Sequence, residues 1–449
     1  MASTYLTRTP SSSSNRKTWT WSAWVKRGLV NGGSDQTLFQ AYVDSSNYTQ
    51  IRFAGGSDLI DIRNVDSGSV TGRLETTRVF RDTSAWYHIV VVWDTTNLTA
   101  GNRMRLYING VEETSFSPDT NPNLNDDSTI NENVVHWIGK AGFSGYPNYF
   151  DGSMAMVQFV DGQAYGPAYF GSTDSNTNIW TPTATSTISD YGTNGFKLAM
   201  DTSTPGADTS GKGNTFTASG TPTLLQGNPQ NNWCTMNPLN PIYQGSASNG
   251  NTTVTGTTAD NYTNSVISSM AFDKGKWYWE TKYAVVNSNT NACVGAAAID
   301  APYQYNTNPT SALGGYISPR FDGELIYNAS STASYFPAIT SAGTIIMQAL
   351  DMDNKKYWLG INGSWYGTAG NTNGNPATGA NPVVTFTEEG FWVPMYRILA
   401  SKFECNFGEG FFGTTAAGTQ ADDNGQGLFA YDVPAGYYAM NTKNLEAYG

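Results

Sequence analysis

Carboxylate pairs are the first residues to consider for chemistry, because hydrolysis of a glycosidic bond needs two carboxylates held across it. On a β-strand, acids at alternate positions point to the same face, as in the pattern E-x-D-x-x-E. This sequence contains no such pattern. Glu112 and Glu113 are adjacent, as are Glu388 and Glu389. Adjacent strand residues point to opposite faces, so we expect these acids to be solvated turn residues.

Histidine is the second residue type with chemical potential, because a Ser/His/Asp triad needs a histidine exposed in a cleft. The chain has only two, His88 within WYHIVVV and His136 within VVHWIG. Both positions predict strand residues of a sheet. The sequence also lacks a G-x-S-x-G nucleophile turn and a G-x-x-x-x-G-K-[ST] phosphate loop. We therefore expect a protein that is not an enzyme.

The cysteines indicate neither a zinc site nor a disulfide framework. Cys234, Cys293 and Cys405 are far apart and odd in number, and no Cys-x-x-Cys or Cys/His spacing is present. We expect folding in a reducing cytoplasm. The first residues lack the apolar core of a signal peptide. The longest apolar run, near 89–93, is too short to span a bilayer.

Composition favours strands and turns over helices. The 449 residues include 47 glycines, only 13% charged residues and 13% aromatic residues. Ser, Thr and Asn fill most other polar positions, and they compete with a helix for backbone hydrogen bonds. The net charge of −12, without a cluster of Lys and Arg, argues against nucleic-acid and anionic-membrane partners.

The chain shows two strand-rich segments separated by a stretch rich in Pro, Gly, Asn, Ser and Thr. The predicted organisation is an N-terminal arm at 1–16, a sandwich at 17–165, a bridge with some strand content at 166–250 and a second sandwich at 251–449. Four apolar residues are expected to anchor the bridge: Phe196, Leu198, Phe216 and Trp233.

Several local patterns predict particular strands and turns. Asn109-Gly110 and Asn362-Gly363 each predict a type I′ hairpin, because both residues accept a positive φ. The run WYHIVVVWD is apolar on both faces, which is typical of a central strand buried on both sides. Four tryptophans within strand patterns are expected in the core: Trp277, Trp279, Trp358 and Trp392.

Two family resemblances add to this interpretation. The first sandwich resembles a laminin-G or concanavalin-A-like lectin domain through WTWSAWVKR, SAWYHIVVVWD, RLYINGVEE, WIGK and YFDGSMAMVQFVDG. The second resembles a SPRY domain through GKWYWETKY, CVGAAAID, GGYISPRFDGELIYN, IIMQALDMDNKKYWLGINGSWYG and FGEGFFG. Together they imply an all-β fold of two antiparallel β-sandwiches, a concanavalin-like jelly roll and then a SPRY-type sandwich, joined by a turn-rich bridge.

The first resemblance also implies a metal. Laminin-G-like domains often hold calcium at loop carboxylates on the rim of the sandwich. By loop position, Asp44 and Asp151 would be those ligands, although structural turns are the other role open to them. No other cofactor is expected.

A third resemblance concerns the whole chain. MASTYLTRTPSSSSNRKTWTWSAWVKR resembles a recurring N-terminus of bacteriophage virion proteins, especially of marine phages, and GTNGFKLAM, DTSGKGNTFTASG and NNWCTMNPL resemble a recurring bridge. This resemblance implies a homo-oligomer on the virion surface, made in the host cytoplasm and not inserted into a membrane. Its N-terminal arm would bind other virion proteins.

Three loops rich in aromatic residues and Asn are the predicted binding surface, because aromatic rings stack on sugars and Asn offers hydrogen bonds. The alternative is that these aromatics cap the sandwich ends or pack against neighbouring subunits. The candidate residues are Phe143, Tyr146, Asn148 and Tyr149 in the first loop, Tyr303, Tyr305 and Asn306 in the second, and Trp365, Tyr366 and Asn371 in the third.

The predicted function is adhesion, as a phage tail fibre or receptor-binding component that binds host-surface glycans without catalysis. A capsid decoration or head-fibre protein with a purely structural role is the alternative. A polysaccharide depolymerase is the third hypothesis, which the missing carboxylate pattern disfavours.

Overall fold

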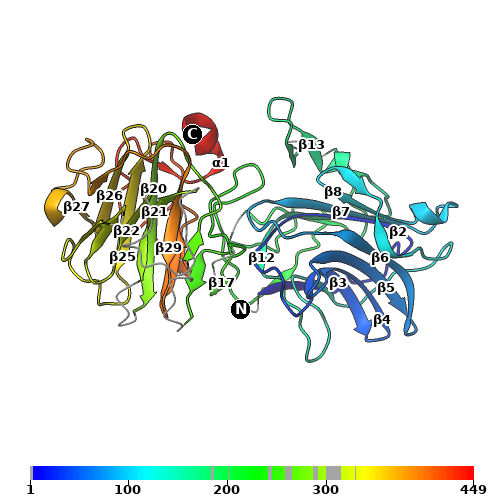
Figure 1. The fold of residues 1–449 in the computed structure, drawn as a ribbon. Helices are drawn as coiled ribbons and strands as arrows, with labels where there is room; N and C mark the ends of the chain where they lie inside the picture. The colour runs from blue at the N-terminus through cyan, green and yellow to red at the C-terminus, as the bar shows by residue number, and fades with distance from the viewer. Residues whose placement is uncertain are drawn as a thin grey trace. The chain divides into compact units, whose positions relative to one another are not determined.

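The computed structural model describes residues 4–183, 187–201, 203–240, 245–257, 265–286, 292–299, 315–328 and 330–449. The chain divides into two compact units, Met1–Leu224 and Leu225–Gly449. Both consist of β-strands arranged in sheets (Figure 1), so the all-β prediction is confirmed. The helix α1 (Thr442–Tyr448) is short, and among the described residues no helix is long and apolar enough to cross a membrane.

The first unit contains two large antiparallel sheets and a small hairpin. The eight-stranded sheet has the order β10 (Phe116–Thr120), β6 (Ser69–Val79), β5 (Leu59–Asp66), β4 (Asn47–Phe53), β3 (Gln36–Asp44), β11 (His136–Ile138), β1 (Tyr5–Arg8) and β16 (Thr217–Ser219). The six-stranded sheet has the order β15 (Phe196–Leu198), β12 (Gly152–Asp161), β2 (Thr18–Arg27), β7 (Tyr87–Asp94), β8 (Met104–Ile108) and β9 (Val111–Glu113). The hairpin joins β13 (Gly171–Thr173) to β14 (Trp180–Pro182).

A single apolar core takes inward side chains from both large sheets of this unit. Within it, Trp19 of β2 and Trp93 of β7 stack with their ring centroids 5.8 Å apart. The other face of β7 is also covered, because Val90 and Val92 pack in a separate buried cluster. The predicted central strand, buried on both sides, is confirmed. The Asn109-Gly110 hairpin is confirmed too, with φ values of 49° and 82°.

The stretch expected as a bridge is divided between the two units. Phe170, Ile188 and Tyr191 cover the outer face of the six-stranded sheet, where they pack with Val90, Val92 and Val160. The four expected anchors of this stretch are all buried, as predicted: Phe196, Leu198 and Phe216 in the core of the first unit, and Trp233 in the second. Their apolar side chains bind the stretch to its neighbouring sheets.

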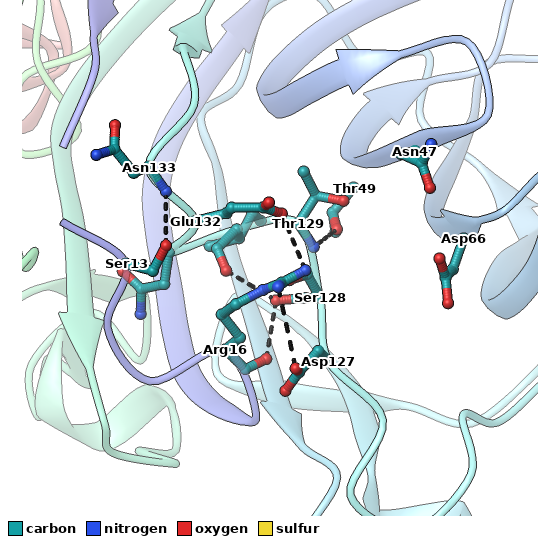
Figure 2. A network of polar contacts seen from close by, with 12 residues as sticks. Ser13, Arg16, Asn47, Thr49, Asp66, Asp127, Ser128, Thr129, Glu132 and Asn133 are labelled. Carbon is teal, nitrogen blue, oxygen red and sulfur yellow. Dashed lines mark hydrogen bonds and ion pairs between the residues drawn. The ribbon is translucent and has the colours of Figure 1, made fainter.

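Residues 4–16, which lie in the expected N-terminal arm, are built into the first unit. β1 pairs with β11 on one side and with β16 on the other. Figure 2 shows the contacts that follow β1: the Asn133 backbone N–H donates to Ser13 Oγ (3.0 Å), and Arg16 bonds the Ser128 carbonyl (2.7 Å) and Glu132 (2.9 Å). The backbone of β1 is therefore occupied by its own sheet.

The second unit also contains two large sheets. The nine-stranded sheet has the order β17 (Ser246–Ser248), β18 (Thr253–Thr255), β30 (Lys402–Asn406), β20 (Lys276–Val285), β25 (Ile345–Asp351), β26 (Lys356–Ile361) and β27 (Ser364–Tyr366), with β28 (Val384–Thr385) on β26 and β33 (Tyr438–Ala439) parallel to β20. The six-stranded sheet has the order β19 (Ser265–Ile267), β29 (Trp392–Arg397), β21 (Cys293–Ala298), β22 (Tyr316–Pro319), β23 (Leu325–Tyr327) and β24 (Ser330–Thr332). β31 (Phe411–Phe412) and β32 (Thr415–Ala416) form a separate hairpin.

Strand β20 packs on both of its faces. Trp277 and Trp279 enter the main core of the unit, while Tyr278 lies in a second cluster with Trp233 and Phe429. The four tryptophans expected in the core are all fully buried, which confirms that prediction. The Asn362-Gly363 hairpin between β26 and β27 is confirmed as well.

A buried carboxylate connects β20 to the segment that follows β32. Glu280 is fully buried, and it accepts hydrogen bonds from the backbone N–H groups of Ala430 and Tyr431 (2.9 Å each) and from the Tyr278 hydroxyl (2.8 Å). Burial raises the pKa of Glu280 despite these donors. This carboxylate fixes residues 430–431 against the sheet.

We predict that Glu280→Ala lowers the free energy of unfolding by about 2–4 kcal/mol, because three buried donors lose their acceptor. Urea unfolding of the full chain, followed by tryptophan fluorescence, measures the change. Glu389→Gln is the control, because that side chain is 86% exposed and its replacement should cost less than about 0.5 kcal/mol. Equal effects of the two variants would contradict the assigned role of Glu280.

Candidate functional site

The outer face of the eight-stranded sheet carries the candidate site. The inward residues Ile51 and Phe53 of β4, and Ile60 and Ile62 of β5, lie in the core. Because strand side chains alternate between faces, the intervening residues point outward. These outward residues include Gln50 and Arg52 on β4, and Asp61 and Arg63 on β5.

Strand register aligns five outward side chains in a row, hereafter the central row: Trp137, Gln40, Gln50, Arg63 and Arg73. Each is the direct cross-strand partner of the next, from β11 through β3, β4 and β5 to β6. With neighbouring strands about 4.8 Å apart, the row extends roughly 19 Å across the sheet. It progresses from an indole through two amides to two guanidinium groups.

An aromatic cluster lies at one end of the central row. The Tyr42 ring contacts Trp137 edge-on, with centroids 6.1 Å apart, and it contacts Phe143 at 5.1 Å. Phe143 also meets Tyr48 edge-on at 5.0 Å. Tyr42, Trp137 and Phe143 are only partly buried, so this cluster offers ring surface to a ligand.

The loop at 139–150 is held against this face by backbone and amide contacts. The Gly142 N–H donates to Gln40 Oε1 (2.6 Å), and the Thr37 N–H donates to the Asn148 carbonyl (3.0 Å). Gly142 lies so close to Trp137 and Tyr42 that a β-carbon would stand 2.9 Å from each ring. A glycine is therefore required where the loop crosses the aromatic cluster.

The two amides in the middle of the row each have an unused polar atom. Gln50 Nε2 donates to Thr37 Oγ1 (2.8 Å). Gln40 Nε2 and Gln50 Oε1 have no hydrogen-bond partner among the described residues, although both side chains are fully buried. Because buried polar atoms without a partner are costly, a bound water is the partner that could reach them.

The charged end of the row is organised around Asp61. Its carboxylate accepts from Arg63 Nε and from Arg73 Nε (2.9 Å each), and it also pairs with Arg52 (2.8 Å). Burial alone would raise the pKa of Asp61, but the three guanidinium groups outweigh burial and lower it. The arginines are thereby fixed in position at the surface.

The four candidate residues in the 139–150 loop have different environments. Phe143 belongs to the aromatic cluster, and Tyr149 lies 6.1 Å from Tyr5. The Asn148 amide donates to Asp35 (3.4 Å). Tyr146 is 74% exposed. The structure thus places this loop beside the sheet face, and its ligand contacts stay a prediction.

The candidate residues of the second unit do not share one surface. Trp365 packs with the cluster around Tyr278 on one face of β27, whereas Tyr366 packs on Phe336 on the other. Asn371 is exposed and bonds the Thr368 carbonyl. Both aromatics are partly buried by their own unit. The remaining three candidates, Tyr303, Tyr305 and Asn306, lie outside the described residues.

The implied calcium ligands do not form a shared cation site in the part of the chain that the structure describes. Asp44 Oδ1 accepts from the Ser46 N–H (2.8 Å) and from the Asn47 amide (2.9 Å), so it closes a turn. Burial raises the pKa of the Asp151 carboxyl. No group of three or more Asp, Glu, His or Cys residues was found there that could hold a metal. Calcium binding stays a prediction.

The paired acids depart from the prediction of solvated turn residues, because Glu112 and Glu113 lie on strand β9. Glu112 and Glu389 are exposed. Glu113 and Glu388 are instead partly buried: Glu113 pairs with Arg78 (3.1 Å), and Glu388 accepts from the Tyr327 hydroxyl (3.0 Å). These contacts give both partly buried acids structural roles.

The two histidines are buried strand residues, as predicted. His88 Nε2 lies 2.9 Å from Ser22 Oγ, a pairing that resembles a nucleophile and its base. However, Trp180 Nε1 donates to His88 Nδ1 (2.9 Å), so the imidazole proton is on Nε2 and points at the serine. A neutral histidine in this tautomer cannot accept the serine proton, and the stacked Trp24 ring covers it.

We predict that neither imidazole titrates between pH 5 and 8. Burial lowers the pKa of His88 to about 3 and that of His136 to about 4. Proton NMR of the two histidine ring signals measures this directly. Because the unfolded chain binds more protons below pH 6.5, stability should fall as the pH decreases from about 6.5 toward 4. A midpoint near 6.5 for either ring would contradict burial.

Comparisons with known proteins agree with the fold of the first unit. Residues 2–165 match the laminin-G-type family described as the concanavalin A-like lectin/glucanases superfamily. A search of curated proteins gave no match.

Among solved structures, the SPRY domain of human HERC1 is 15% identical, with a TM-score of 0.27, and the match covers 38% of this chain and 93% of that one. A heptameric SAP-like pentraxin from Limulus polyphemus is 16% identical, with a TM-score of 0.27, and covers 36% and 72%. A candidate carbohydrate-binding protein from Bacteroides ovatus is 15% identical, with a TM-score of 0.31, and covers 49% and 59%. The family match is what supports a lectin-like fold for the first unit.

Proposed function

We propose that this protein binds carbohydrate without catalysis, through the outer face of the eight-stranded sheet of its first unit. The observation that carries the proposal is the partly exposed ring surface of Tyr42, Trp137 and Phe143, which lies on this face beside the loop at 139–150. The lectin-like family match of residues 2–165 supports the same conclusion.

The chemistry of the row suits a sugar. Aromatic rings such as Trp137 and Tyr42 can stack on the C–H face of a pyranose, because a large amphipathic ring binds with little loss of conformational entropy. Gln40 and Gln50 are fully buried, and Gln40 accepts from the Gly142 N–H, so these amides support the surface from below and do not contact the sugar. The loop at 139–150 adds partly exposed Tyr149 and exposed Tyr146 at the edge of this surface.

The absence of catalysis is proposed on two observations. Both histidines are buried, and His88 is in a tautomer that cannot accept the proton of its neighbouring serine. On the candidate face, the Asp61 carboxylate is ion-paired with three arginines. It therefore cannot act as an acid or a nucleophile. Release of reducing ends from a bound polysaccharide would overturn this part of the proposal.

The finer proposal is that the bound glycan is on a host cell and the protein is an adhesin on the surface of a phage particle. Its support is the resemblance of the N-terminus and the bridge to virion proteins. Residues 5–8 are already paired on both sides within the first unit, so this strand is not available for docking to a neighbour. A capsid decoration or head-fibre protein would need this arm to bind a neighbouring protein, so the pairing of residues 5–8 does not favour that alternative.

We predict that Trp137→Ala weakens glycan binding at least tenfold, because the ring supplies the stacking surface and 1.4 kcal/mol corresponds to tenfold. A glycan array identifies ligands for the full chain, and calorimetry measures their affinities. Tyr169→Ala is the control. It also removes a partly exposed ring, but that ring lies in the segment between β12 and β13, away from the eight-stranded sheet. Unchanged binding by Trp137→Ala would locate the site elsewhere.

A further inference from the structure

The central row has an asymmetry of charge that the proposed sugar site does not require. Its five positions hold an indole, two amides and two guanidinium groups, and none holds a carboxylate. This is notable in a chain with a net charge of −12. One end of the row is therefore aromatic, while the other presents two guanidinium groups that are paired with Asp61 and Glu75.

Arg63 and Arg73 reach the surface, as does the counterion Glu75, whose side chain is 18% exposed, whereas Asp61 does not. The Asp61 side chain is 0% exposed, whereas the Arg63 and Arg73 side chains are 17% and 26% exposed. The second acid that pairs with Arg73 is Glu75 (2.6 Å), which is aligned with Asp61 rather than with the central row. Acidic side chains thus lie beneath and beside the row.

Both arginines keep donors available for a ligand. Arg63 uses Nε and Nη2 on Asp61, and Arg73 uses Nε on Asp61 and Nη2 on Glu75. Among the described residues, neither Nη1 has a hydrogen-bond partner in the protein. Because the ion pairs already immobilise both side chains, binding an anion costs little further side-chain entropy.

We infer that the glycan bound on this face is acidic, with a neutral ring stacked at Trp137 and a carboxylate or sulfate group held by Arg63 and Arg73. This inference rests on the proposed function. Three strand spacings separate Trp137 from Arg63, or roughly 14 Å, so the ligand is an oligosaccharide rather than a single sugar. Charge-assisted hydrogen bonds from two guanidinium groups supply the selectivity for the anion.

The test uses the full chain on an array of neutral, uronate-containing and sulfated oligosaccharides, followed by calorimetry on each ligand found. We expect acidic glycans to bind, with the uronate and sulfate members showing which anion fits. Raising NaCl from about 0.05 to 0.5 M should weaken acidic ligands several-fold, because screening acts on the ion contacts. Neutral ligands should be unaffected by salt.

Substitutions at the cationic end separate the two proposals. Arg63→Gln and Arg73→Gln should each weaken an acidic ligand about tenfold and change a neutral one less than twofold. Arg78→Gln is the matched control. Arg78 lies on β6, as Arg73 does, but it pairs with Glu113 instead of Asp61. Since Arg63→Gln alone leaves Asp61 less compensated, an unchanged affinity for a neutral ligand shows that this variant is folded and that its aromatic end is intact.

Each outcome decides between the proposals. Acidic ligands that depend on both Arg63 and Trp137 support this inference. Neutral ligands that depend on Trp137, with no gain from an acidic group, would overturn it and leave the proposed function standing. If no oligosaccharide binds, or if Trp137→Ala binds as the native chain does, the proposed function fails as well.

Discussion

The alternation of side chains in β4 and β5 ties the surface of the eight-stranded sheet to its core. Ile51, Phe53, Ile60 and Ile62 must face inward to leave water, and a shift of one residue would expose all of them. The same alternation aims Gln50 and Arg63 outward. The polar face is therefore specified by apolar burial on the opposite side, and each cross-strand neighbour of the central row is set by the register of the core.

The pairing of charges follows from this arrangement. Once Asp61 is fixed on an outward position, its carboxylate is buried among Arg52, Arg63 and Arg73, which come from three neighbouring strands. Burying a carboxylate is costly unless it is paired and hydrogen-bonded. The three guanidinium groups meet that requirement and become rigid in doing so. The three arginine side chains at the surface are thus held in place because they neutralise one buried carboxylate.

Much of the fold could be predicted from the sequence. Alternating apolar runs and the Asn-Gly turns predicted the hairpins, the doubly buried strand β7 and the core tryptophans, because these depend on local patterns. The partition of residues 166–250 between the units could not be predicted, since it depends on which sheet face Phe170 and Trp233 cover. β1 was missed for the same reason: YLTR is too short to show a pattern without its partners.

The candidate site was less predictable. The aromatic residues of AGFSGYPNYFDG predict a binding loop, but no local pattern distinguishes Trp137, Gln40, Gln50 and the arginines from other strand residues. Their signal is the polar member of each alternating pair in YTQIRF and LIDIRNV. That signal identifies an outward face without showing which strands adjoin. The row exists only through the pairings of β11 with β3 and of β3 with β4, and the first of these joins segments far apart in sequence.

The position of β1 has a consequence for biosynthesis. Tyr5 of β1 pairs with Ser219 of β16, so β1 waits for a partner that is synthesised more than two hundred residues later. Until then one edge of β1 presents unpaired backbone groups, which in other sheets recruit foreign strands. A chain that stalls before β16 would carry this open edge, whereas a chain synthesised past it closes the sheet that bears the candidate site.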